Sequence, residues 1–105
     1  MFYRSKKEQA IAIGNQLKGY LKMNNDWVRE QYLSKNKDKN KVKLDRMQHI
    51  IEGFRQALYG LDLEHHCEFK ISDRSGCTAP EYKSFTIEGI EIFSEDEIIL
   101  ETSKA

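Results

Sequence analysis

The chain has 105 residues and a formal net charge of zero, because 17 Lys and Arg residues balance 17 Asp and Glu residues. This length predicts a single domain over residues 1–105, and a hydrophobic content of 39% excludes a disordered chain. Two cysteines exclude a disulfide framework and a four-cysteine zinc site. The charged N-terminus and the absence of any long apolar run predict a cytoplasmic protein that does not associate with membranes.

The charges are distributed unevenly along the chain. Residues 1–60 carry 13 basic and 6 acidic side chains, a balance of +7, whereas residues 61–105 carry 4 basic and 11 acidic side chains, a balance of −7. The sequence therefore predicts a basic helical half and an acidic β half, and it excludes a uniformly basic nucleic-acid-binding protein. Frequent lysine and isoleucine with a single proline are typical of a bacterial or phage protein from an AT-rich genome.

The first predicted element is an amphipathic helix. Ser5 and Glu8 form a capping box, and apolar residues follow at helical spacing over about 18 residues, which predicts an end near Asn24: Ala10, Ile13, Leu17, Tyr20 and Leu21. The segment Asn24-Asn25-Asp26 is a predicted break. The residues from Trp27 to Ser34 then form either a short second helix or a continuation of the first, kinked at the break.

A lysine-rich segment and a second long helix complete the basic half. Five lysines in nine residues, from Lys35 to Lys43, predict a solvated loop. Apolar residues at spacings of three and four predict a helix from about residue 40 to Tyr59, with Gly60 as its left-handed stop: Leu44, Met47, Ile51, Phe54 and Leu58. The two long helices should lie antiparallel, with their apolar stripes in contact.

After Gly60 the apolar residues alternate, which predicts β-strands. A strand around Cys67 places Cys67, Phe69 and Ile71 on its buried face, and a second strand over residues 81–87 buries Phe85 and Ile87. Glu88-Gly89 is either a two-residue hairpin turn, with Ile87 facing Ile90 and Phe85 facing Ile92, or a bulge in a longer strand. A last strand is predicted at residues 98–100, and residues 102–105 should fray.

The predicted fold class is therefore α+β. Two main antiparallel helices, with or without a short third helix between them, pack on a C-terminal antiparallel sheet of three to four strands.

Residues with metal-binding or catalytic chemistry are few. His65, His66 and Cys67 are adjacent, but strand alternation turns His66 away from the other two, so neither a metal site nor a cofactor is expected. Cys77 beside Arg74 is the candidate nucleophile, although no neighbouring sequence supplies a base or an oxyanion hole. The carboxylates gather at strand ends and turns, where they should form a solvated rim. The sequence therefore predicts a protein that is not an enzyme.

Two sets of residues are candidates for binding. The lysine-rich segment and the start of the next helix would bind nucleic acid or another anion through Lys35, Lys37, Lys39, Lys41, Lys43 and Arg46. A protein partner would contact aromatic side chains beside this segment and carboxylates of the sheet, namely Trp27, Tyr32, Glu91, Glu95 and Glu97.

The leading hypothesis is a small non-enzymatic binding or regulatory protein, an adaptor or inhibitor-like module that binds a macromolecular partner, most simply a protein. One alternative is a nucleic-acid-binding module that uses segment 35–46. A second alternative is an acidic mimic of nucleic acid that blocks a basic site on another protein. The apolar face of the second long helix also leaves a homodimer open.

Overall fold

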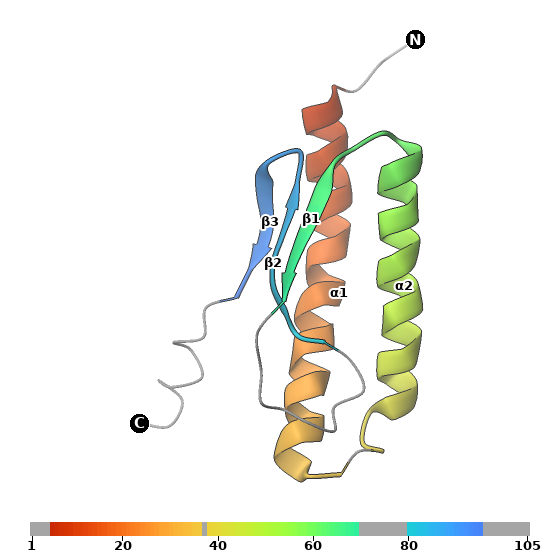
Figure 1. The fold of residues 1–105 in the computed structure, drawn as a ribbon, viewed down its shortest axis with the longest axis vertical. Helices are drawn as coiled ribbons and strands as arrows, with labels where there is room; N and C mark the ends of the chain where they lie inside the picture. Colours follow the sequence, from red (N-terminus) through yellow and green to blue (C-terminus); the bar gives the residue numbers. More distant parts are fainter. Residues whose placement is uncertain (1–4, 37, 70–79, 96–105) are drawn as a thin grey trace.

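The computed structural model describes residues 5–36, 38–69 and 80–95, and it places two helices against one face of a three-stranded sheet (Figure 1). The elements in chain order are α1 (Lys6–Ser34), α2 (Lys41–Gly60), β1 (His65–Phe69), β2 (Tyr82–Ile87) and β3 (Ile90–Ser94). The strands are antiparallel in the order β1-β2-β3. The predicted α+β arrangement is confirmed.

Helix α1 is a single element of 29 residues. The Ser5 side chain accepts a hydrogen bond from the Glu8 N–H at 3.1 Å, as the capping box predicts. The prediction that the helix ends near Asn24 is wrong, and the alternative of a continuation is confirmed. Asn24 and Asn25 do not cap a new helix, because both lie within α1, where they are buried. Asn24 donates to the Pro80 carbonyl, just before β2, and Asn25 to the Tyr82 carbonyl of β2.

Helix α2 has nearly the predicted bounds but a different end. Gly60 is its last helical residue, and Asp62 takes the left-handed conformation at φ 58°, so the prediction of a left-handed stop at Gly60 is wrong. The chain leaves the helix through a bond from the Leu63 N–H to the Leu58 carbonyl, 2.9 Å long. This bond brings Leu63 back onto the core, where it is buried.

Strands β2 and β3 form a hairpin. Glu88 and Gly89 both have positive φ, at 51° and 76°, which is the conformation of a tight two-residue turn, and Ile87 pairs with Ile90 as expected. The prediction that Phe85 faces Ile92 is wrong: Phe85 pairs with Phe93, because a register shift leaves Ile92 as an extra residue in β3.

Ile92, the extra residue in β3, lies against Gly14 of α1. A Cβ on Gly14 would lie 2.5 Å from Ile92 Cδ1, so any larger residue here would displace the Ile92 side chain. The predicted last strand at residues 98–100 and the predicted first-strand residue Ile71 lie outside the described residues.

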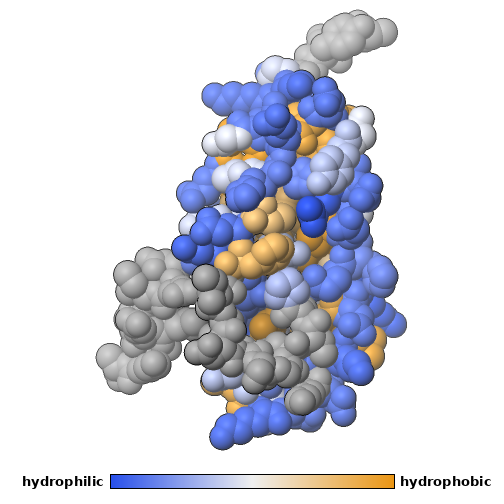
Figure 2. Space-filling model, in the orientation of Figure 1, coloured by the Kyte–Doolittle hydropathy of each residue, from blue (hydrophilic) through white to orange (hydrophobic). Residues whose placement is uncertain are grey.

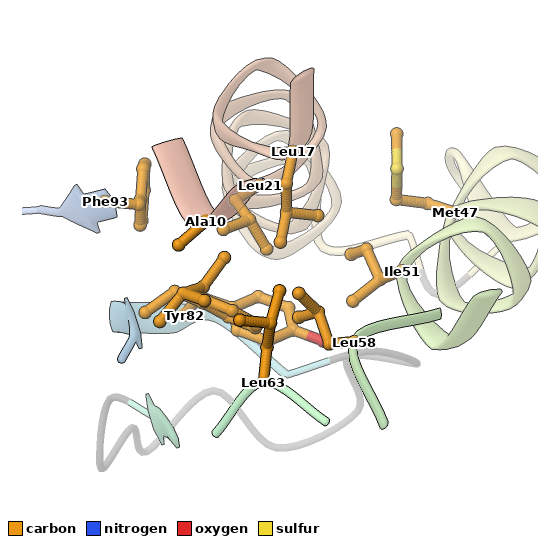
Figure 3. Packing of buried hydrophobic residues seen from close by; sticks show 11 residues of the cluster. Ala10, Leu17, Leu21, Met47, Ile51, Leu58, Leu63, Tyr82 and Phe93 are labelled. Atoms are coloured by element: carbon orange, nitrogen blue, oxygen red, sulfur yellow. The ribbon is translucent and has the colours of Figure 1, made fainter. Parts of the chain in front are cut away.

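The core lies between the helical hairpin and the sheet (Figure 3). Its buried side chains include Leu17 and Leu21 of α1, Met47, Ile51 and Leu58 of α2, and Phe85 and Ile87 of β2. Phe69 was predicted on the buried face but is exposed, because it is the last residue of the edge strand β1. Its ring rests against Tyr82, with the ring centres 5.0 Å apart.

Candidate interaction surface

The end of α1, the turn after it and the start of α2 form one end of the molecule, opposite the first turn of α1 (Figure 1). Five exposed cations lie here and are called the basic tip: Lys35, Lys39, Lys41, Lys43 and Arg46. Lys37 lies outside the described residues. The structure therefore brings five of the six predicted anion-binding residues to one end of the fold.

Side-chain amides hold the turn that carries the basic tip. The Gln31 side chain donates to the Lys39 carbonyl at 2.9 Å, and the Asn40 side chain donates to the Trp27 carbonyl at 3.2 Å. Lys35 and Asn40 adopt left-handed conformations, which reverse the chain between the two helices. The lysines are thus presented by a hydrogen-bonded turn, where the sequence predicted a solvated loop, and by the first turns of α2, where it predicted a helix.

The cations of the basic tip have no carboxylate partner among the described residues. Lys43 Nζ lies 5.4 Å from the centre of the Trp27 ring, a cation–π contact. Trp27 itself is half-buried and packs against Val28 and Leu44, so it closes this end of the core. Within the described residues, no ion pair therefore neutralises the positive charge of the basic tip.

Two aliphatic side chains stand among these cations. Leu33 and Val42 are 75% and 63% exposed, and Tyr32 beside Leu33 is also exposed. Neither Leu33 nor Val42 was among the predicted site residues. Val42 is the one apolar residue of the lysine-rich segment, so its position gave a signal. Leu33 gave none, because its exposure depends on which face of the last turn of α1 the rest of the fold leaves uncovered.

The predicted acidic residues do not form one surface. Glu91 is exposed on β3, and Glu97 lies outside the described residues. The Glu95 carboxylate is occupied inside the protein, because it accepts from Asn25 Nδ2 at 2.6 Å and pairs with Arg29. The strand-bearing face is largely hydrophilic (Figure 2), but Glu68 on it already pairs with Lys83 at 3.3 Å.

Six polar side chains form a buried network that the sequence patterns did not reveal, called the polar cluster: Asn24, Asn25, Arg29, Gln48, Glu81 and Glu95. Arg29 Nε lies 3.1 Å from Glu81 Oε2, and the Gln48 side chain donates to Asn24 Oδ1 at 2.8 Å. The cluster connects α1 with α2, β2 and β3. Its carboxylates are buried against a guanidinium, which suits holding the fold together and not acid–base chemistry on a substrate.

His65 and Cys67 share the helix-facing side of β1, but they are poorly suited to catalysis. Burial raises the pKa of the Cys67 thiol, so the nucleophilic thiolate is disfavoured.

Burial and the nearby Arg55 charge lower the pKa of His65, with the Leu63 backbone acting in the opposite direction. The His65 ring stacks on Phe85 at 5.7 Å, and Arg55 Nε donates to its Nε2 at 3.3 Å. Cys77 lies outside the described residues.

The lowered pKa of His65 predicts a loss of stability on acidification. Below pH 6.5 the unfolded chain binds a proton at His65 that the folded chain resists, so the free energy of unfolding should fall as the pH drops from 6.5 towards the folded pKa. Above pH 6.5 this contribution is complete. Urea unfolding between pH 7.5 and 5 should show the loss, and His65→Gln should reduce it.

The exposed His66, on the other face of β1, provides the matched control for this measurement. His66→Gln should retain the pH dependence of the parent chain. A pH dependence that is the same in the parent and in His65→Gln would contradict the assignment to His65.

Within the described residues, no group of three or more His, Cys, Asp or Glu side chains is placed to hold a metal ion. In the same part of the chain, no helix has the length and apolarity needed to cross a membrane. No protein-family model matches the chain, and the comparisons with curated proteins and with solved structures find no match.

Proposed function

We propose that this protein is a non-catalytic binding module whose basic tip docks an acidic partner protein. The observation that carries the proposal is the position of Leu33 and Val42 among five cations that lack carboxylate partners in the described structure. Exposed aliphatic groups within a charged rim are typical of protein interfaces, where the apolar contact supplies affinity and the charges supply orientation and association rate.

The same features favour a protein over a nucleic acid as the partner. A phosphate backbone rewards cations through counterion release but gives no reason to expose a leucine and a valine between them. The mimicry alternative has less support, since Glu95 and Glu68 are neutralised by Arg29 and Lys83.

The proposal is tested by comparing three double variants of the full chain as baits, with quantitative mass spectrometry of the retained proteins. Lys39→Glu/Lys41→Glu reverses the charge of the basic tip, and Leu33→Ser/Val42→Ser removes its apolar groups. Lys18→Glu/Lys22→Glu makes the same change in net charge on exposed residues of α1 outside the basic tip. Both tip variants should lose a protein that the control retains, each by about tenfold or more, or about 1.4 kcal/mol.

A duplex-binding measurement at low salt separates the nucleic-acid alternative. If about four phosphates are contacted, the logarithm of the affinity should fall with the logarithm of the salt concentration at a slope near −4. The basic tip would be assigned to nucleic acid if duplex binding of this kind is lost in Lys39→Glu/Lys41→Glu and kept in Leu33→Ser/Val42→Ser. Retention of the same proteins by all three variants would overturn the proposal.

A further inference from the structure

An apolar stripe lies on the face of the helical hairpin that points away from the sheet. It consists of Gly19, Tyr20 and Met23 of α1 with Ile50 and Phe54 of α2, and is called the outer stripe. Met23 is nine residues from Gly14, which contacts β3, so it projects about 180° away from the sheet. Met23 and Ile50 are 42% and 40% exposed, and the Tyr20 and Phe54 rings meet with centres 5.7 Å apart.

The outer stripe has an open, shallow hollow beside the Met23 side chain. A hollow of about 320 Å³ is lined by Gln16, Gly19, Tyr20 and Met23, roughly ten times the ~30 Å³ that one water molecule occupies in the liquid. Apart from the two neighbouring residues and the backbone of α1 itself, nothing lies within 4 Å of the place where a Cβ on Gly19 would be. The hollow can therefore accept a side chain from outside the molecule.

We propose that the outer stripe binds the outer stripe of a second copy of this chain, forming a two-fold symmetric dimer with the sheets on the outside. Gly19 lies two residues before position 21 of α1, and Met23 lies two residues after it. When two copies of α1 cross antiparallel at position 21, Met23 of each copy therefore lies opposite the hollow at Gly19 of the other. The surface is thus self-complementary, as a two-fold interface requires.

Helix α2 fits the same two-fold axis, which crosses α1 at the level of residue 21. The Tyr20–Phe54 contact and the hydrogen bond from Gln48 to Asn24 place residue 21 of α1 level with about residue 52 of α2. Ile50 and Phe54 are equally spaced about that level, so Ile50 of one copy lies opposite Phe54 of the other. Both helices therefore contribute matched pairs in a single arrangement.

Charge favours a second copy and selects its orientation. The five residues of the outer stripe are uncharged, and the zero net charge of the chain gives no overall repulsion between copies. A two-fold axis along the helices would place the two basic tips side by side, whereas an axis across the helices places them at opposite ends. The second arrangement leaves each basic tip free for a partner.

The first test is the mass of the full chain in solution by light scattering and sedimentation. The parent chain should have twice the mass of one chain and keep it at high salt, because the contact is apolar. Met23→Glu and Ile50→Glu should each raise the dimer dissociation constant about a hundredfold, since a charge enters an apolar contact. Ile11→Glu is the matched control, because Ile11 is 41% exposed on α1 but lies outside the outer stripe.

Three further variants test the fit and the orientation. Gly19→Met should weaken the dimer by placing two methionines against each other, and Gly19→Met/Met23→Gly should restore it. Spin labels at Lys35→Cys, in a Cys67→Ser/Cys77→Ser background, should lie about 40 Å apart in the antiparallel dimer.

Circular dichroism establishes that each variant is folded. Any of three results would overturn the proposal. The parent chain could remain monomeric at high concentration, Met23→Glu and Ile50→Glu could leave the dimer unaffected, or the spin labels could lie close together.

Discussion

Replacing Arg29 with methionine should lower the free energy of unfolding by about 3–5 kcal/mol, a large part of the 5–15 kcal/mol typical of a domain. Arg29 contacts both Glu81 and Glu95, whose side chains are 1% and 12% exposed. Methionine keeps the apolar part of the side chain but removes the guanidinium that both carboxylates contact. The free energy of unfolding should fall because the buried carboxylates of Glu81 and Glu95 then have no opposite charge to compensate for their removal from water.

Urea unfolding of the parent, Arg29→Met and Arg46→Met measures this effect. Arg46 is exposed on α2, so its replacement should change the free energy of unfolding by no more than about 0.5 kcal/mol. Adding Glu81→Gln and Glu95→Gln to Arg29→Met should recover part of the loss, because the variant then holds no unneutralised carboxylate at these positions. A loss below about 1 kcal/mol in Arg29→Met would show that the polar cluster is solvated enough to tolerate the missing charge.

Those features of the fold that depend on local periodicity could be predicted from the sequence. The spacing of apolar residues gave the stripe of α2, and alternation gave the buried side of β2, since burial follows directly from helical and strand geometry. The Ser5 cap and the turn at Glu88-Gly89 were also accessible, because short motifs determine them. The bulge at Ile92 was not accessible, since no local motif marks it and its residue packs against Gly14 of a distant helix.

Long-range polar contacts explain the main errors. Asn24-Asn25 is a helix-breaking pair by local propensity, yet hydrogen bonds to Pro80 and Tyr82, more than fifty positions away, keep both inside α1. Glu95 was grouped with the solvated carboxylates because its partner Arg29 is on another element.

In the candidate site, the lysines of the basic tip were visible as a run in the sequence. The exposure of Leu33 was not visible, because it depends on which face of the last turn of α1 the rest of the fold covers.

Replacing Asn25 with alanine should lower the free energy of unfolding by about 2–4 kcal/mol, because two buried backbone groups lose their partner. Asn25 Nδ2 donates to the Tyr82 carbonyl at 2.8 Å, and Asn25 Oδ1 accepts from the Tyr82 N–H at 2.9 Å. The amide thereby pairs with the first residue of β2 as a neighbouring strand would. Urea unfolding gives the size of the loss, and Asn15→Ala, on the exposed side of α1, should change stability by no more than about 0.5 kcal/mol.

Asn25→Asp separates the shape of the side chain from its hydrogen bonding. Aspartate still accepts from the Tyr82 N–H, but it places a second carboxylate oxygen against the Tyr82 carbonyl and against Glu95 Oε2, which lies 2.6 Å from Asn25 Nδ2. Its cost at neutral pH should therefore equal or exceed that of alanine, although aspartate fills nearly the same volume. If Asn25→Asp is instead as stable as the parent, the volume of the side chain holds α1 against β2, and the hydrogen bonds to Tyr82 are not what keeps the helix uninterrupted.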